Sequence, residues 1–166
     1  MLVVGGGVNN RLENSELLYS IAQKADMPVA TTLMARGVFP SDSKYSVGMP
    51  GMHGTVEANY VVQHCDCLVA VGMRFDDRVT SDISKFAPNA KHIIHVDIDP
   101  AEIGKNVVTD FPLVADSIDF LEALYEQLQH CDNAAWVDDV NASRYEVQSP
   151  AGSELPTKET VGVIDH

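Results

Sequence analysis

The sequence contains few basic residues for its length. Its 166 residues include 11 lysines and arginines against 24 aspartates and glutamates, which gives a formal net charge of −13. A chain this acidic repels the phosphate backbone of nucleic acids and the anionic headgroups of lipids. We therefore expect neither a nucleic-acid partner nor a membrane partner, and any anionic ligand must be held by a local group of side chains.

Long apolar runs and an even set of cysteines are also lacking. No stretch reaches the roughly 18 consecutive apolar residues of a membrane span. Met1 leads directly into a strand-like segment rather than into a charged leader. The three cysteines are an odd number in a chain of this length, which is typical of reduced thiols. These features predict a cytoplasmic protein.

One cluster of potential metal ligands is present, at His64, Cys65 and Cys67. The two cysteines alternate into the apolar run CLVAVG, where buried thiols are common, so core packing is favoured over metal binding. No zinc-type spacing occurs elsewhere, and no metal site is predicted.

Apolar runs and amphipathic patterns alternate along the first 128 residues, which is enough chain for one ordinary domain. The runs with the length of buried strands are 2–7, 28–34, 67–72, 92–99 and 112–116. Helices are predicted at 15–25, 55–64 and 117–128, with Thr55 and Ser117 as N-caps. Near-continuous apolar strands favour a parallel sheet covered on both faces. We therefore predict an α/β domain with a doubly wound, mainly parallel sheet.

The composition changes after residue 128. Segment 129–166 has no strong strand and includes QSPAGSELPTKE, which is typical of a linker, while the final TKETVGVIDH resembles the start of a helix. We place the domain at residues 1–128, followed by helix and linker at 129–166. Both ends of the chain are expected to be boundaries inside a longer polypeptide.

The most informative stretch is VAVGMRFDDRV, residues 69–79, where an apolar strand runs into glycine and then into Arg74, Asp76, Asp77 and Arg78. Ligands of parallel sheets bind beyond the carboxyl ends of the strands. An arginine held there by neighbouring carboxylates is a preformed clamp for phosphate or carboxylate. This stretch predicts an anion site.

Gly5, Gly6 and Gly7 follow the first strand, where glycine lets backbone amides approach a pyrophosphate. The dinucleotide fingerprint itself fails, because Asn10 replaces its third glycine and Asp26 falls at a helix end rather than at the tip of a second strand. The three glycines therefore indicate either a ligand contact or a plain strand-to-helix turn.

The loop GMPGMHG, residues 48–54, enters a helix and carries methionines that adapt to planar rings. It is suited to a flat polar ligand or an anion, and the alternative is a capped connection with packed methionines. His53 in this loop is either a base or ring contact, or a hydrogen-bonded structural histidine.

Carboxylates follow the last two predicted strands. In HVDIDP, Asp97 is suited to accept hydrogen bonds from ribose hydroxyls. Alternatively Asp97 and Asp99 hold magnesium, although no GxxxxGK phosphate loop accompanies them. Asp116 either contacts adenosine or caps the helix after it. No serine, cysteine or lysine has a convincing base beside it, so no catalytic residue is predicted.

Taken in order, VGGG, TTLMARGVFP, GMPGMHGTVEAN, CDCLVAVGMRFDDRVT, FAPNAKHIIHVDIDPAEIGK and VAD resemble the large subunit of the acetohydroxyacid synthase (acetolactate synthase) family over about residues 2–128. GMHG followed by GxRFDDR is the most specific part. The resemblance implies the central domain of that enzyme, a six-stranded Rossmann-like sheet that carries a largely structural FAD. It lies between the pyrimidine-binding and pyrophosphate-binding thiamine domains.

The same resemblance implies an enzyme that joins two pyruvates, or pyruvate and 2-oxobutyrate, in branched-chain amino-acid biosynthesis. Its thiamine diphosphate and Mg²⁺ belong to the flanking domains, so the 166-residue chain alone is expected to be inactive. A homodimer or tetramer with a regulatory small subunit is implied for the parent. The alternatives are an NAD-dependent oxidoreductase domain and a scaffold domain that binds nothing.

The resemblance also implies roles for individual positions. Arg74 and Arg78 would face ribityl or phosphate groups, and Asp97 an adenosine hydroxyl. Met52 and Asp77 would lie near the substrate channel. The sequence departs from the family at Pro50, where leucine is usual, and at Ala115 and Ser117, where glycine and alanine are common. The implied FAD contacts are Gly5, Gly6, Gly7, Thr32, Leu33, Gly51, Met52, His53, Gly72, Arg74, Asp76, Arg78, Val79, Asp97, Ile98 and Asp116.

Overall fold

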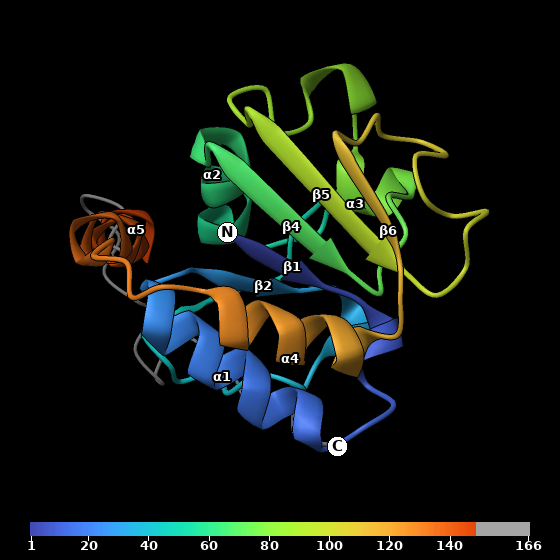
Figure 1. Ribbon diagram of the computed structural model, residues 1–166. Helices are drawn as coiled ribbons and strands as arrows, with labels where there is room; N and C mark the ends of the chain where they lie inside the picture. The colour runs from blue at the N-terminus through green and yellow to red at the C-terminus, as the bar shows by residue number, and fades with distance from the viewer. Residues whose placement is uncertain (149–166) are drawn as a thin grey trace, which may run out of the picture.

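The computed structural model describes residues 1–148, and the side chains up to residue 142 (Figure 1). Six parallel strands form one sheet in the order β3-β2-β1-β4-β5-β6. The predicted α/β class and parallel sheet are confirmed. The strands are β1 Leu2–Val4, β2 Val29–Thr31, β3 Ser46–Gly48, β4 Cys67–Val71, β5 His92–Asp97 and β6 Phe111–Val114.

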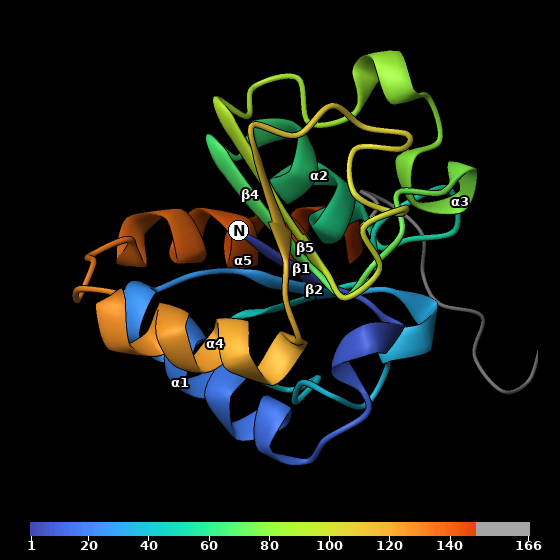
Figure 2. The same ribbon diagram turned by 45° about the vertical axis from the view of Figure 1, so that its right-hand side comes forward.

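Helices lie on both faces of this sheet. Figures 1 and 2 show α1 (Glu13–Ala25) and α4 (Ser117–Gln127) side by side on one face. On the other face lie α2 (Val56–His64) and the short α3 (Asp77–Thr80), and α5 (Ala134–Gln148) packs against α2. Single turns of 3₁₀ helix, η1 Gly6–Val8, η2 Leu33–Ala35 and η3 Ile83–Lys85, complete the connections.

The chain winds in two directions from the centre of the sheet. From β1 it passes through α1 to β2 and then to β3, and it returns through α2 to β4, on the other side of β1. The connections that leave β1 and β4 therefore diverge at this point. Parallel α/β sheets bind their ligands at such a switch point, beyond the carboxyl ends of the strands.

The core consists of two apolar clusters, one on each face of the sheet. Along β4, Val69 and Val71 belong to the cluster under α1 and α4, while Leu68 and Ala70 belong to the cluster under α2. This strict alternation of buried side chains on both faces explains why the sequence of β4 is apolar without interruption.

Three sequence-based expectations need correction. Strand β3 was not predicted, because Ser46–Gly48 is short and has no apolar run. Strand β6 was expected to be buried, but all four of its residues are exposed because it lies at the edge of the sheet. The cap of α4 is Asp116 rather than Ser117, since the Asp116 side chain accepts a hydrogen bond from the Ile118 amide. Thr55 caps α2 as predicted.

The packed structure continues beyond residue 128. Helix α5 lies in this region, and its Val137 and Val140 are each 1% exposed within the two core clusters. Tyr60 on α2 stacks on Trp136 of α5, and its hydroxyl donates to Asp139. The predicted linker and the helix start at 157–166 lie outside the described residues.

None of the helices within residues 1–148 has the length and apolar composition of a membrane span. The three cysteines are free, and the described part of the chain holds no group of three or more metal-type ligands. His64 stacks on Tyr60 instead, with its Nδ1 2.8 Å from the Tyr60 carbonyl oxygen.

The amino terminus provides a test of this packing by pH. The Met1 amine donates to the Cys67 carbonyl oxygen at 2.7 Å, and its burial lowers the pKa of this amine below the usual value. The unfolded chain therefore binds more protons than the folded one between the lowered pKa and about pH 8. We expect the free energy of unfolding, measured in urea, to rise with pH across that window.

Acetylation of the Met1 amine supplies the matched control, because every other titrating group is unchanged. The acetylated chain should show a smaller rise of stability with pH over the same window. Equal pH dependence in the two forms would contradict a buried, desolvated amine.

Candidate functional site

The sequence-predicted site residues all lie at or after the carboxyl ends of strands. We call this side of the sheet, where all six strands end, the carboxyl edge. Gly51 to His53 follow β3, Thr32 and Leu33 follow β2, and the three glycines follow β1. Residues 72–79 follow β4, while Asp97 and Ile98 come at the end of β5 and Asp116 follows β6. The strand spacing makes this edge about 24 Å wide. A single extended ligand can therefore contact several of these segments.

A pocket of about 80 Å³ lies at one end of this edge, where the connections after β1, β4, β5 and β6 meet. Five of the predicted site residues line it, namely Gly7, Gly72, Asp97, Ile98 and Asp116. The other lining residues are Asn10, Val96, Ala115 and Ser117. The remaining predicted residues lie along the same edge outside this pocket.

The two carboxylates of the pocket are fixed by the backbone. Oδ1 of Asp97 accepts a hydrogen bond from the Asp99 amide at 2.9 Å, and Oδ1 of Asp116 accepts one from the Ile118 amide at 3.0 Å. The Asp116 Oδ2 atom is 3.8 Å from Arg11 Nη2. Carboxylates held in this way accept hydrogen bonds from neutral hydroxyl groups, so the pocket is suited to a sugar rather than to an anion.

The magnesium alternative has less support from this geometry. The Asp99 carboxylate turns back to accept a hydrogen bond from the Ala101 amide at 2.9 Å, while Asp97 accepts from Asp99. Among residues 1–148 no third acidic, histidine or cysteine ligand joins this pair. The two side chains therefore serve as acceptors within successive turns.

Asn14 is a buried residue that supports the pocket from behind. Its Nδ2 atom donates to the Val8 carbonyl at 2.8 Å and lies 3.2 Å from Ser117 Oγ, which in turn donates to the Gly7 carbonyl. These bonds tie the connection after β1 to the start of α4. Sequence reasoning missed Asn14. A single asparagine in the first turn of α1, four residues after Asn10, does not indicate a contact with the distant Ser117.

The glycines after β1 make room for a neighbouring backbone. A side chain on Gly5 would overlap the Gly72 carbonyl oxygen and Met73, and one on Gly7 would come within 2.9 Å of the Gly72 Cα atom. The Gly5 and Gly7 amides already donate to Val71 and Gly72 carbonyls at 2.9 Å. The expectation that these amides face a pyrophosphate is therefore not met for Gly5 and Gly7, and close chain packing explains both glycines.

The arginines after β4 form no ion pair with a carboxylate of residues 1–148. Arg74 and Arg78 are exposed, and within the described residues neither forms an ion pair. The carboxylate of Asp76 instead caps α3 by accepting the Val79 amide at 3.1 Å. The predicted clamp of arginines held by neighbouring carboxylates is thus wrong in its detail. Both guanidinium groups are nevertheless available to an anion.

His95 anchors the segment that carries these arginines. Its ring is fully buried, its Nε2 donates to the Met73 carbonyl oxygen at 2.8 Å, and its edge contacts the Phe75 ring. A carbonyl oxygen only accepts, so the proton is on Nε2. Sequence reasoning missed this role because His95 reads as part of an apolar strand.

The loop 48–54 is closed by Asn59 of α2 and packed against α3. Asn59 bonds both the amide and the carbonyl of Gly51, at 2.8 and 3.0 Å. Gly51 has a φ of +106°, and a side chain there would overlap the Arg78 carbonyl. The Met52 amide donates to that carbonyl at 3.1 Å. Two segments predicted separately, GMHG and RFDDR, therefore meet in space.

Exposed apolar side chains form a rim on the segments after β2 and β3. Leu33 is 64% exposed and Met52 is 67% exposed, and Met34 beside Leu33 is also open to solvent. The Asn9 side chain donates to the Met34 carbonyl at 3.1 Å, which joins η1 to η2. The carboxyl edge thus offers carboxylates that accept hydrogen bonds from hydroxyl groups in the pocket. It also offers guanidinium groups after β4 and apolar side chains after β2 and β3.

This arrangement defines a class of protein, a doubly wound α/β domain with a candidate ligand site at its topological switch point. The family described as "Thiamine pyrophosphate enzyme, central domain" matches residues 1–124. The chain belongs to that family, whose members form the middle domain of thiamine pyrophosphate enzymes.

Curated relatives agree with this assignment. The chain is 50% identical to the probable acetolactate synthase large subunit of Methanocaldococcus jannaschii over 83% of its length and 24% of that protein. It is 52% identical to the acetolactate synthase large subunit IlvB1 of Mycobacterium tuberculosis over 78% of its length and 21% of that protein. For the large subunit of Parasynechococcus marenigrum the identity is 39%, over 99% of the chain and 28% of the relative. The chain thus spans about a quarter of the length of these relatives.

The close approach of the segments after β1 and β4 can be tested by substitution. The Gly5→Ala change should lower the free energy of unfolding by more than about 2 kcal/mol, because the new methyl group overlaps rigid backbone. Gly6→Ala is the matched control, since its methyl group would lie 3.0 Å from the Met34 Cβ atom and 3.8 Å from the Met34 carbonyl oxygen, without the overlap that arises at Gly5.

The control should stay within about 1 kcal/mol of the unchanged chain. Urea unfolding followed by circular dichroism measures both. Similar stability losses in the two variants would show that Gly5 is not confined by the Gly72 backbone.

Proposed function

We propose that this chain is the FAD-binding central domain of an acetolactate synthase large subunit. The observation that carries the proposal is one continuous edge of the sheet. The segments that follow the strands along these roughly 24 Å carry a pocket with two carboxylate acceptors, two exposed arginines that form no ion pair within residues 1–148, and exposed apolar side chains. An adenine-flavin dinucleotide needs these three environments in its sugar, diphosphate and ring parts.

Each environment suits one part of FAD. Asp97 accepts a ribose hydroxyl of the adenosine, and Asp116 completes the wall of the same pocket. Arg74 and Arg78 face the diphosphate or the ribityl chain as the only cationic side chains in residues 72–79. Leu33 and Met52 present apolar surface to the flavin ring. FAD in this position stabilises the domain, and no residue of the chain is assigned a catalytic role.

The pocket is small for such a ligand. Sites that enclose a drug-sized molecule have volumes of roughly 300–1,000 Å³, whereas this pocket measures about 80 Å³. Most of the FAD therefore rests on an open surface in the 166-residue chain, where water competes for every polar contact. We expect weak binding by the chain alone and tighter binding where other domains cover the edge.

The proposed parent enzyme condenses two pyruvates, or pyruvate and 2-oxobutyrate, to acetohydroxyacids in branched-chain amino-acid biosynthesis. Thiamine diphosphate and Mg²⁺ belong to flanking pyrimidine-binding and pyrophosphate-binding domains, which are the partners of this one. Thiamine diphosphate would supply the means to decarboxylate pyruvate. We propose that the parent is a homodimer or tetramer with a regulatory small subunit and that it lies in the cytoplasm. Met52 and Asp77 lie near its substrate channel.

Titration of FAD into the chain, followed by quenching of flavin fluorescence, tests the cofactor. Saturable binding is expected, and Asp97→Ala should weaken it at least about tenfold because a charged acceptor for a hydroxyl is lost. The control Asp99→Ala changes a neighbouring exposed carboxylate that does not line the pocket. It should alter the Kd by less than about threefold.

The same titration tests whether Arg74 contacts the diphosphate of FAD. Arg74→Ala should weaken FAD binding and reduce its dependence on salt, because a phosphate contact contributes to both. Lys91→Ala removes a positive charge next to the start of β5, at the opposite edge of the sheet, and should have little effect. NADH binding with FAD rejected would support an oxidoreductase domain instead, and no binding of either would support a scaffold domain.

Pyruvate consumption tests the assignment of the chemistry to other domains. The purified 166-residue chain, supplied with thiamine diphosphate, Mg²⁺ and FAD, should consume no pyruvate. The longer polypeptide that contains this chain should produce acetolactate under the same conditions. Turnover by the 166-residue chain would overturn the view that it holds no catalytic group.

A further inference from the structure

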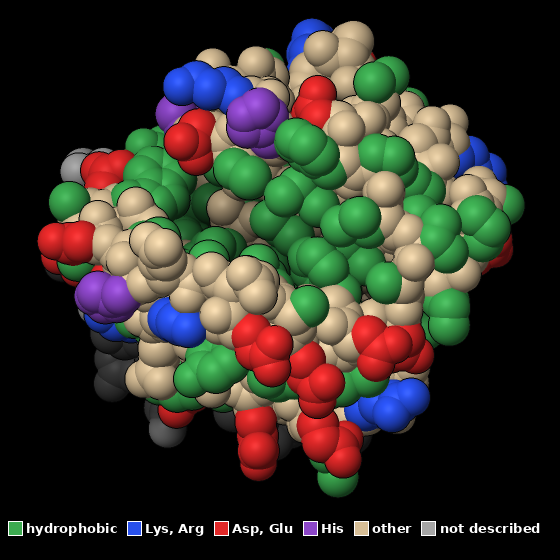
Figure 3. All heavy atoms as spheres, in the orientation of Figure 1, with side chains coloured by type: hydrophobic (Ala, Val, Ile, Leu, Met, Phe, Trp, Pro, Cys, Tyr) green, Lys and Arg blue, Asp and Glu red, His purple; other side chains and the backbone are tan. Residues whose placement is uncertain are grey.

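An apolar strip lies open on the face of the sheet that carries α1 and α4. Phe111 and Leu113 on β6 are 50% and 41% exposed, and they pair with Ile94 and Val96 of β5. Paired residues of neighbouring strands point to the same face. Ile94 and Cys67 are half-buried members of the cluster under α1 and α4. We call Cys67, Ile94, Phe111 and Leu113 the open face. Figure 3 shows the continuous apolar surface in this region.

The topology explains why this region is uncovered. The connections from β4 to β5 and from β5 to β6 contribute Phe86 and Val107 to the cluster on the opposite face. Right-handed crossovers place all connections of this half of the sheet on that side. Among residues 1–148, the face in question is covered by α1 and α4, with Val137 of α5 joining their cluster.

Two helices are too few to cover six strands. A helix is about 10 Å wide and strands are about 4.8 Å apart, so two helices side by side cover about four strands. Because α4 packs against α1 rather than over β6, the outer strands stay open. No further element within residues 1–148 lies over them in Figures 1 and 2.

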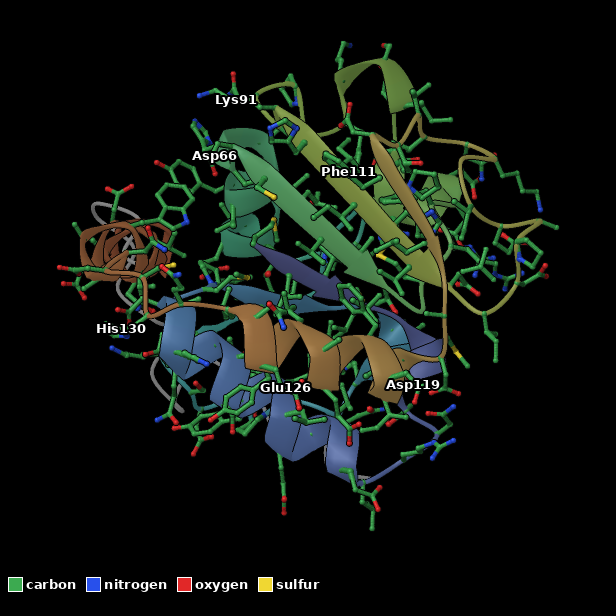
Figure 4. All side chains as sticks on the ribbon, in the orientation of Figure 1. Asp66, Lys91, Phe111, Asp119, Glu126 and His130 are labelled. Atoms are coloured by element: carbon green, nitrogen blue, oxygen red, sulfur yellow. The ribbon has the colours of Figure 1, made fainter. Side chains whose placement is uncertain are left out.

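The border of the open face is acidic along α4, while Asp66 and Lys91 lie together at the upper end of this face in Figure 4. Figure 4 labels Phe111 on the open face and Asp119 and Glu126 on α4, which runs along its lower side. All three are exposed, as is Glu122 on the same helix. With a net charge of −13, two copies of this chain repel each other as they approach. The α4 side of the border therefore favours an occupant with basic residues over a second copy.

We propose that the open face docks another part of the longer polypeptide, through an apolar surface bordered by lysine and arginine. This inference rests on the proposed function, in which the chain is a middle domain. The relatives that it matches are about four times as long, so most of each lies outside the matched region. That remainder supplies the occupant, and the contact holds the central domain in place beside its neighbours.

The test compares one substitution in two settings. Leu113→Lys places a charge on the open face, both in the 166-residue chain and in the longer polypeptide that contains it. Val108→Lys is the matched control, because Val108 is 88% exposed in the connection before β6, beside Val107 of the opposite cluster. Thermal unfolding is measured for each. Sedimentation of the 166-residue chain at tens of micromolar reports self-association.

In the 166-residue chain, which should be a monomer, Leu113→Lys should shift the Tm by less than about 2 °C. In the longer polypeptide it should lower the Tm by at least about 3 °C or split the transition, while Val108→Lys does neither. Leu113→Ser should act in the same direction by a smaller amount. An unchanged Tm in the longer polypeptide, or a dimer of the 166-residue chain that Leu113→Lys dissolves, would overturn the proposal.

The docking proposal and the proposed function can fail independently in this experiment. Flavin content and acetolactate production of the unsubstituted longer polypeptide report the cofactor and the activity alone. If both are absent while Leu113→Lys still destabilises the polypeptide, the docking holds and the assigned activity fails. If both are present and Leu113→Lys has no effect, the reverse is true.

Discussion

The site depends on one close approach of backbone to backbone, where the chain leaves β1 and β4. Gly5 and Gly7 lie against Gly72, and two amides of the first segment donate to carbonyls of the second at 2.9 Å. No side chain fits between them. Gly72 itself has a φ of +58°, which lets β4 end in a sharp turn. This contact brings the connections of both halves of the sheet to one place.

The chemistry of the edge follows from that contact. The turn at Gly72 directs the chain toward Arg74 and toward Arg78 of α3, while His95 donates a hydrogen bond to the Met73 carbonyl oxygen. On the other side Asp97 and Asp116 have their carboxylates fixed by amides. Among residues 1–148 the Arg74 and Arg78 guanidinium groups are thus separate from these two carboxylates, although Arg11 lies 3.8 Å from Asp116. Such a separation suits a ligand with a neutral sugar and a charged diphosphate, and it lets an acidic protein bind an anion locally.

Much of the fold could be predicted from the sequence, because parallel strands buried on both faces are apolar throughout. The prediction of strands failed for β3 and for the burial of β6, because neither strand is an apolar run buried on both faces. Strand β3 is too short to show a pattern, and β6 is an edge strand whose apolar residues are exposed rather than packed into a core. For the site, the strand ends marked by glycine or charge were recognised. The contacts of Asn14, Asn59 and His95 were not, since each joins segments far apart in sequence by a single hydrogen-bonded side chain.

The central claim is that FAD lies along the carboxyl edge of the sheet, across the switch point. Nuclear magnetic resonance of the labelled 166-residue chain, titrated with FAD, tests this residue by residue. We predict that amide shifts change in segments 5–10, 32–34, 51–53, 72–78, 97–99 and 115–117, with the opposite edge near Lys91 unaffected. Shift changes confined to another surface, or none at saturating FAD, would contradict it.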